Sequence, residues 1–195
     1  LGKNKDTPLE HAGEDYLKGL STTHAWADYF CINISSPNTE DLRRLQEGDQ
    51  LSRLLEKLCR QREMLDQEAG KKTPLLIKLA PDWEEEALQQ SIARIKTFPL
   101  DGVIATNTTL SREGLTSPLA RESGGLSGKP LLKSSNKVIK TLYREIGAHI
   151  PIIGVGGIFT AEDAYAKIKA GASAVQVYTG LIYQGPGMVR ELKKG

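Results

Sequence analysis

Cysteine is scarce in this sequence: only Cys31 and Cys59 occur among 195 residues. Two isolated thiols, one in an apolar run and one in a helical pattern, indicate a reducing environment and argue against a disulfide framework. Histidine is also sparse, and His11, His24 and His149 lack the spacing of metal ligands. We therefore expect no bound metal and no redox role for the thiols.

Neither sign of charge dominates the chain, because 26 Lys and Arg residues balance 24 Asp and Glu residues. No stretch has the clustered basic residues of a nucleic-acid binding surface, so we expect no nucleic-acid partner. No apolar run approaches the roughly 18 residues of a membrane span, and the first residues do not resemble a secretory signal. At 39% hydrophobic and 26% charged residues, the composition is that of a soluble globular domain with a sizeable core.

Short apolar runs alternate with amphipathic segments along the chain, which is typical of a parallel α/β sheet. Thr7 and Glu10 predict a capping box at the start of a first helix, and Asp82 with Glu85 predicts another helix start. The stretch 111–128 lacks periodicity, as binding loops do. The expected strands are residues 29–34, 75–80, 101–106, 151–155 and 174–178, and the other expected helices are 50–68, 87–95, 134–147, the segment from a Thr160 cap to near 171, and the tail from 186.

Polar residues follow all five expected strands, and their positions distinguish an open sheet from a barrel. An open dinucleotide-binding sheet concentrates its chemistry at one switch point and carries a G-x-G-x-x-G turn, which residues 155–158 do not match. Chemistry at every strand end is typical of a (β/α)8 barrel, which needs eight strands and about 250 residues. We therefore expect residues 1–195 to be the C-terminal part of a single barrel domain, with about five of its βα units.

Two features of the strand ends point to ligand binding. Gly156-Gly157 lies between a strand and a capped helix, where bare backbone N–H groups can hold a phosphate; a tight turn with positive φ is the alternative. Lys78 lies inside an apolar strand and would face the centre of a barrel near its catalytic rim, unless its side chain extends to solvent.

Neutral polar side chains also gather at the strand ends. Each is more often a turn or cap residue when taken alone, but the set suits a planar, hydrogen-bonding ligand. Ser36 precedes a proline and has no Gly-x-Ser-x-Gly elbow around it, so a hydrolase triad is not expected. The members of the set are Asn33, Asn38, Asn107, Thr106 and Thr108.

Six motifs, taken in order, resemble the dihydroorotate dehydrogenase family. They are NISSPNT (33–39), LIKLAPD (76–82), DGVIATNTT (101–109), GGLSGKPL (124–131), PIIGVGGI (151–158) and AGASAVQVYTG (170–180), and the N-terminal LGKNKDT is similar as well. The matches cover nearly the whole chain. The resemblance implies an FMN-containing (β/α)8 barrel that oxidises (S)-dihydroorotate to orotate in pyrimidine (UMP) biosynthesis.

Position 36 implies the class within that family. The soluble class has a cysteine as catalytic base, whereas the membrane-associated, quinone-reducing class has a serine. This chain reads Asn33-Ile-Ser35-Ser36-Pro-Asn38, so the resemblance implies that Ser36, not Ser35, removes the C5 proton while hydride leaves C6 for the flavin. Because serine is a weak base, a proton relay through water or a hydroxyl is expected.

The resemblance also implies binding roles, with no metal among them. The charge of Lys78 near the flavin ring would favour the anionic reduced form, and Gly157 and Thr179 would lie at the phosphate end of FMN. The expected FMN contacts are Asn33, Lys78, Thr106, Gly128, Gly157, Tyr178 and Thr179, and the expected substrate contacts are Asn33, Asn38, Asn107 and Thr108.

A membrane partner is implied too. Relatives of the serine class dock on the membrane through N-terminal amphipathic helices that admit quinone, and we expect those helices and the first three barrel strands to be missing from these residues. The expected location is peripheral to a membrane, with the bacterial cytoplasmic (inner) membrane favoured over the mitochondrial inner membrane. We expect residues 1–195 alone not to be a competent flavoenzyme, because an open barrel exposes apolar edges.

Two alternatives remain open from the sequence. One is another FMN- or phosphate-binding barrel, similar to a dihydrouridine synthase or an isomerase, which would share Gly156-Gly157 but would not need the serine and threonine motifs. The other is a non-catalytic barrel remnant that acts as a binding module, against which the presence of Ser36, Lys78 and Asn107 argues.

Overall fold

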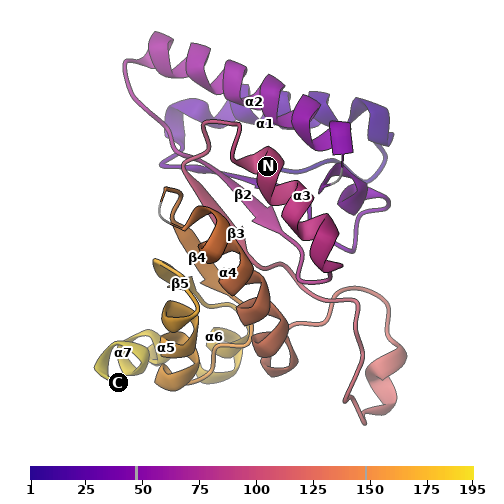
Figure 1. Cartoon of the computed structure of the whole chain (residues 1–195), viewed down its shortest axis with the longest axis vertical. Coiled ribbons are helices and arrows are strands. Elements are labelled where there is room, and N and C mark those ends of the chain that lie inside the picture. Colours follow the sequence, from indigo (N-terminus) through magenta and orange to yellow (C-terminus); the bar gives the residue numbers. More distant parts are fainter. Residues whose placement is uncertain (47, 148) are drawn as a thin grey trace. The chain divides into compact units, whose positions relative to one another are not determined.

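Apolar runs that stop at a polar residue or a glycine form the strands, close to where the sequence predicts them. The computed structural model describes residues 1–46, 48–147 and 149–195. The strands are β1 (Phe30–Asn33), β2 (Leu75–Leu79), β3 (Gly102–Ala105), β4 (Ile152–Val155) and β5 (Ala174–Gln176), in the sheet order β1-β2-β3-β4-β5. Figure 1 labels β2 to β5.

Helices separate the strands, so the predicted α/β class is confirmed. Among the described residues, no helix combines the length and the apolar character needed to cross a membrane. The helices are α1 (Ala12–Thr23), α2 (Gly48–Ala69), α3 (Glu85–Ile95), α4 (Leu132–Ile146), α5 (Ala161–Lys169), α6 (Thr179–Gln184) and α7 (Gly187–Lys194). Shorter 3-10 turns are η1 (Leu9–His11), η2 (His24–Trp26), η3 (Leu42–Gln46), η4 (Pro118–Arg121) and η5 (Lys129–Leu131).

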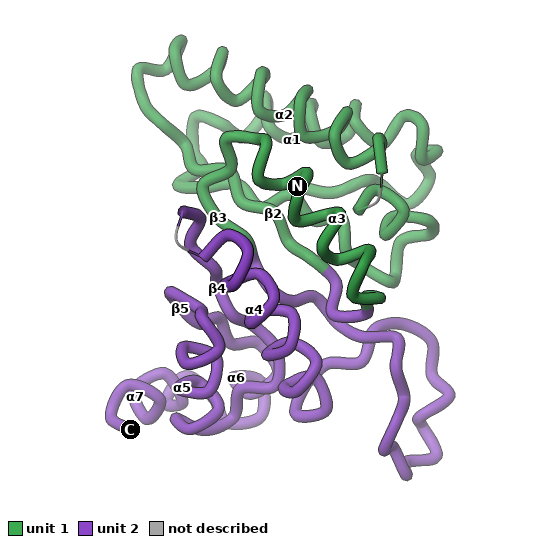
Figure 2. Tube along the Cα trace, in the orientation of Figure 1, with its two compact units in different colours: residues 1–79, 83–103 green, residues 80–82, 104–195 purple. Residues whose placement is uncertain are grey.

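The chain divides into two compact units, coloured separately in Figure 2. Unit 1 comprises Leu1–Leu79 and Trp83–Val103, and unit 2 comprises Ala80–Asp82 and Ile104–Gly195.

Unit 1 is built on the parallel pair β1 and β2, whose register aligns Asn33 with Lys78. Side chains alternate between the two faces of a strand, so Ile32 and Ile77 share one face, where both are completely buried. Helices α1 and α2 pack against each other and supply further fully buried side chains. These are Tyr16 and Leu20 from α1 and Leu51, Leu55 and Leu58 from α2.

Unit 2 contains the parallel pair β4 and β5, in which Val155 is aligned with Gln176. Helices α4 and α5 pack against β4, and α7 packs against α5 and α6. The predicted Thr160 cap is confirmed: its hydroxyl accepts the Asp163 N–H at 3.3 Å, and the Asp163 carboxylate accepts the Thr160 N–H at 3.1 Å. A small core beneath these helices consists of Ile158, Ala164 and Met188.

The predicted capping box at Thr7 is wrong. The chain instead enters η1 after Pro8, which makes no side-chain cap, and α1 begins only at Ala12. The Thr7 hydroxyl and the Asn4 backbone N–H both donate to the carboxylate of Asp15, and these bonds lower the Asp15 pKa. Thr7 therefore bonds to the carboxylate of Asp15, in the first turn of α1, and does not cap a helix.

The helix start predicted from Asp82 is also wrong. Helix α3 begins at Glu85, with Glu84 before it and no side-chain cap. The Asp82 carboxylate accepts instead from the hydroxyl of Thr109 and, at 2.9 Å, from the backbone N–H of Leu110. Both partners lie within unit 2 and are distant in sequence, which a local capping pattern cannot reveal.

The last strand is shorter than predicted. Strand β5 ends at Gln176, and the following residues turn into α6, a six-residue helix that the sequence did not predict. Tyr178 precedes this helix rather than closing the strand. The tail helix predicted from residue 186 is confirmed as α7.

Candidate functional site

The end of β1 carries the first group of expected site residues, all within unit 1. Asn33 and Lys78 are partners in the parallel register, and both are half-buried on the face opposite Ile32 and Ile77. The Tyr16 hydroxyl donates to the backbone oxygen of Asn33 at 2.7 Å, and burial raises the Tyr16 pKa, so the phenol stays a donor. Helix α1 thus fixes the backbone from which the Asn33 side chain extends.

The charge of Lys78 acts on the face of β1 that carries Asn33. Burial raises the pKa of the Cys31 thiol, and the positive charges of the N-terminal amine and of the Lys78 ammonium oppose that rise. Cys31 lies two residues before Asn33 and therefore on the same side of β1. The Lys78 side chain is half-buried there and not fully extended into solvent.

The two serines after β1 have different environments. Ser35 is fully buried, its hydroxyl donates to Asn33 Oδ1 at 3.2 Å, and its backbone oxygen accepts from Arg43 Nε at 3.1 Å. Ser36 is half-buried, and its Oγ accepts the backbone N–H of Asn38 at 3.2 Å. Ser35 therefore supports the turn, while Ser36 is the less buried of the two serines.

The end of β3 carries the second group, within unit 2. Thr106 is only 2% exposed, and its backbone N–H donates to the oxygen of Val155 at 2.9 Å. The Thr106 hydroxyl is buried and has no hydrogen-bond partner among the described residues. Asn107 and Thr108 are half-buried, and Asn107 Oδ1 accepts the backbone N–H of Thr108 at 2.9 Å.

The turn after β4 needs glycine at both positions. Gly156 has a φ of 117° and Gly157 a φ of 78°, in the region that side chains disfavour. A Cβ on Gly157 would lie 2.6 Å from the backbone nitrogen of Leu132 at the start of α4. The positive φ that the sequence left open is therefore present, and the bare backbone packs directly against another helix.

Gly128 and Thr179 lie side by side in unit 2. A Cβ on Gly128, whose φ is 84°, would be 3.4 Å from Thr179 Cγ2. The Thr179 hydroxyl donates to Ser127 Oγ at 2.9 Å. The sequence reasoning missed Ser127, although it stands next to Gly128 in GGLSGKPL. Tyr178 is 74% exposed.

The long stretch after β3 is closed at its base. Thr109 and Leu126 form an antiparallel bridge, with hydrogen bonds of 3.0 and 2.8 Å between their backbones. The Arg112 guanidinium donates to the backbone oxygens of Glu122 and Gly124 on the far side of the loop. The sequence reasoning missed Arg112, because nothing local to it shows that it bonds across the loop.

The structure gathers the expected residues in two groups, one in each unit. The group in unit 1 offers amides, a hydroxyl and one ammonium, and the group in unit 2 offers an amide, hydroxyls and glycine backbone; groups of these kinds bind planar polar ligands and anions. In the part of the chain that the structure describes, no cluster of His, Cys, Asp and Glu could hold a metal ion. Unit 1 holds Asn33, Ser36, Asn38 and Lys78; unit 2 holds Thr106, Asn107, Thr108, Gly128, Gly157, Tyr178 and Thr179.

Curated relatives resemble the chain along its whole length. A dihydroorotate dehydrogenase from Trichodesmium erythraeum, named as the quinone-dependent enzyme, is 50% identical over 100% of this chain and 52% of its own length. The enzyme of the same name from Idiomarina loihiensis is 52% identical over 98% of this chain and 58% of its own length. The chain therefore spans about half the length of the curated relatives that it matches.

Solved structures agree with the sequence relatives. The crystal structure of DHODH from Eimeria tenella in complex with ferulenol superposes with a TM-score of 0.93 at 40% identity, over 99% of this chain and 55% of that one. The fold is thus that of part of a (β/α)8 barrel. The model of the family described as dihydroorotate dehydrogenase matches residues 1–195. The chain belongs to the dihydroorotate dehydrogenase family.

Proposed function

We propose that these residues belong to a dihydroorotate dehydrogenase (quinone), which oxidises (S)-dihydroorotate to orotate and passes the electrons to a quinone in pyrimidine (UMP) biosynthesis. The observation that carries the proposal is the turn after β1. There the half-buried Ser36 hydroxyl is held by the Asn38 N–H, and the Lys78 ammonium stands beside Asn33 on the neighbouring strand. Relatives named for this activity, 50% and 52% identical, support it.

FMN fits the residues of unit 2. The buried Thr106 hydroxyl has no partner among the described residues, as expected of a group that awaits a ligand atom. Gly157 and Gly128 are buried, have a positive φ and are packed so closely that a Cβ would meet Leu132 or Thr179, and the backbone N–H groups of such glycines suit a phosphate. We assign the FMN phosphate to Gly157 and Thr179, with Gly128 and Tyr178 beside it.

Bound FMN would supply a hydride acceptor for C6 of dihydroorotate. Asn33 and Thr106 would hydrogen-bond the flavin, and the charge of Lys78 would stabilise negative charge on the reduced ring.

Ser36 would act as the base that takes the C5 proton. An N–H donor stabilises the alkoxide form of a serine and so lowers the cost of releasing the hydroxyl's own proton, which must leave as the C5 proton arrives. The Asn38 N–H, 3.2 Å from Ser36 Oγ, is such a donor. Since the oxygen also carries its own proton, that proton must leave through water or another hydroxyl.

The remaining polar residues would hold the substrate. Asn33, Asn38, Asn107 and Thr108 supply amide and hydroxyl groups of the kind that bind a carboxylate and the amides of a pyrimidine ring. None of them carries a net charge, so they would orient the substrate through hydrogen bonds alone.

We further propose that residues 1–195 form the C-terminal part of one barrel domain. The outer edge of β1 supports this: the Asn33 N–H donates to the backbone oxygen of Leu1 at 2.9 Å, and the Leu1 nitrogen donates to Cys31 O at 2.7 Å. Leu1 therefore occupies the position of a neighbouring strand. We place the enzyme at a membrane surface, the bacterial cytoplasmic (inner) membrane by preference and the mitochondrial inner membrane otherwise, with no nucleic-acid partner.

The test is Ser36→Ala in the full-length protein, followed by anaerobic stopped-flow reduction of the bound flavin with dihydroorotate. General-base catalysis contributes about 10²–10⁴-fold, so we expect flavin reduction to slow by at least about 100-fold while FMN stays bound. Orotate should still quench the flavin fluorescence, because the binding residues are unchanged.

Ser35→Ala is the matched control. Its hydroxyl supports the turn through Asn33, so this variant should lose thermal stability and keep most of the reduction rate. Reduction of Ser36→Ala at the wild-type rate would remove Ser36 from the mechanism. A flavoprotein that neither dihydroorotate nor orotate affects would point to another FMN-dependent barrel enzyme.

A further inference from the structure

A buried lysine lies outside the residues assigned to the site. Lys167 on α5 is 0% exposed, and its Nζ donates to Ser135 Oγ at 2.9 Å and to Asn136 Oδ1 at 3.0 Å, both on α4. Burial lowers the Lys167 pKa to about 8, against the opposing charge of Asp163. Lysine is almost never fully buried unless it has a specific partner, so the exchange of solvent for two neutral acceptors calls for an explanation.

Strand β4 makes room for this lysine. A Cβ on Gly154 would lie 3.1 Å from Lys167 Cδ and 3.0 Å from the Cβ of Ala172. The glycine therefore allows the lysine stem to pass directly over the strand. A side chain at this strand position would crowd the lysine stem on its way to α4.

The chemistry of the ammonium fixes the direction of the next hydrogen bond. Lysine has three donors and no acceptor, so Ser135 Oγ accepts from Lys167 and must direct its single hydrogen elsewhere. Its nearest acceptor is the backbone oxygen of Val155 at 2.7 Å, with that of Ala105 farther away at 3.5 Å. Lys167 thus orients a hydroxyl toward the last residue of β4.

The Val155 oxygen receives a second donor, the backbone N–H of Thr106 at 2.9 Å. One carbonyl therefore joins three elements of unit 2: helix α4 through Ser135, the end of β3 through Thr106, and the end of β4 itself. Thr106 carries the buried hydroxyl that has no partner in the described part of the chain, and Gly156-Gly157 follows Val155 directly.

We infer that Lys167 and Ser135 are positioning residues, which hold the end of β4 in register with Thr106. They thereby set the positions of Thr106 and Gly157, two of the residues proposed to bind FMN. The inference rests on the proposed function for the identity of the ligand, but the positioning itself concerns the protein alone. A lysine that only filled space would be replaced without local consequence by a methionine, which has a similar unbranched stem.

The test compares Lys167→Met with Lys169→Met in the full-length protein. Lys169 lies on the same helix, is exposed and has its Nζ over the Tyr165 ring, so it is the matched control. Hydrogen exchange of the apoprotein is expected to accelerate at residues 104–107 and 154–158 in Lys167→Met alone. The FMN dissociation constant, measured by fluorescence quenching, should rise about tenfold, the scale of one hydrogen bond.

Ser135→Ala removes the same link with a smaller change in volume, and it should give the same local pattern if Lys167→Met does not fold. Exchange and FMN affinity equal to those of Lys169→Met would overturn the inference, as would a uniform acceleration throughout unit 2. If the wild type binds no FMN but exchange still rises locally, the positioning stands and the proposed function falls.

Discussion

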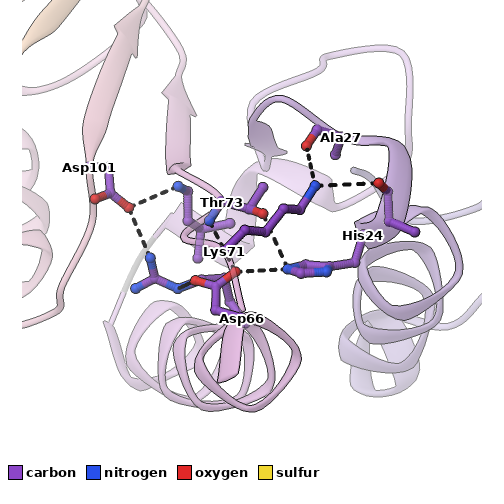
Figure 3. A network of polar contacts seen from close by, with 9 residues as sticks. His24, Ala27, Asp66, Lys71, Thr73 and Asp101 are labelled. Carbon is purple, nitrogen blue, oxygen red and sulfur yellow. Dashed lines mark hydrogen bonds and ion pairs between the residues drawn. The ribbon is translucent and has the colours of Figure 1, made fainter. Parts of the chain in front are cut away.

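Replacing Asp101 with asparagine would remove a carboxylate on which three donors of unit 1 converge. Asp101 Oδ2 accepts from Arg62 Nη1 at 3.1 Å and from the backbone N–H of Leu75 at 3.0 Å, and Oδ1 accepts from Lys72 Nζ at 2.6 Å. Figure 3 draws this carboxylate in a polar network that also includes Asp66 and His24. We expect Asp101→Asn to lower the free energy of unfolding by about 2–3 kcal/mol.

The magnitude follows from how buried each partner is. Lys72 is 71% exposed, so its ion pair contributes at most about 1 kcal/mol. The Arg62 side chain is 7% exposed, and removal of the partner of a buried ion costs about 3–5 kcal/mol. The loss should fall below that range, because Arg62 keeps Asp66 at 3.6 Å and the Pro99 oxygen at 3.3 Å, and asparagine can still accept from Leu75.

The same site predicts a pH dependence. Burial raises the Asp101 pKa, but the bonds from Lys72 and Leu75 and the nearby charges outweigh it, so the net pKa lies below the usual 3.8. A carboxylate with a lowered folded pKa stabilises the protein above its unfolded pKa and loses that contribution as pH falls through the folded value. The difference between wild type and Asp101→Asn should therefore be constant at neutral pH and shrink below about pH 4.

Urea unfolding monitored by circular dichroism between pH 3 and pH 8 measures both quantities. Asp41→Asn is the matched control, because the Arg44–Asp41 pair is exposed and 3.7 Å long and asparagine tolerates the positive φ of 56° at that position. The control should change the unfolding free energy by less than about 0.5 kcal/mol. The reasoning would be refuted if Asp101→Asn also lowered the unfolding free energy by less than about 0.5 kcal/mol. It would be refuted as well if the difference from wild type did not shrink in acid.

Three further substitutions or reactions test other parts of the structure. Gly157→Ala should lower the unfolding temperature and weaken FMN binding at least about tenfold, because its Cβ would meet the Leu132 backbone at 2.6 Å; unchanged titration of FMN would contradict this. Cys59, whose pKa burial raises to about 11 from 9.0, should alkylate with iodoacetamide at pH 8 about 100-fold more slowly in the native protein than after unfolding. Arg112→Ala should speed chymotrypsin cleavage within residues 110–124, since it removes the bonds to the backbone oxygens of Glu122 and Gly124; mass spectrometry of the fragments shows whether cleavage moves there.

Local patterns predicted the regular elements well. The five strands lie within two residues of their predicted ends. A short apolar run bounded by glycine, proline or polar residues is readily buried in an α/β fold as a strand that ends at those residues. Thr160 was predicted as a cap correctly because its partner, Asp163, lies three residues away. Thr7 and Asp82 occur in the same kind of local pattern, yet neither caps a helix. Thr7 bonds to Asp15, and Asp82 accepts hydrogen bonds from Thr109 and Leu110.

The sequence by itself determined the alternation of strands and helices, the polar strand ends and, through the order of its motifs, the family. Only the tertiary structure decided which of two adjacent serines is accessible, because the burial of Ser35 depends on Asn33 and Arg43. It alone shows that Lys167, one of two lysines in an ordinary amphipathic helix, is buried against α4. Hydrogen bonds within a turn leave a local signature in the sequence, whereas burial and bonds between distant segments arise only when the chain has folded.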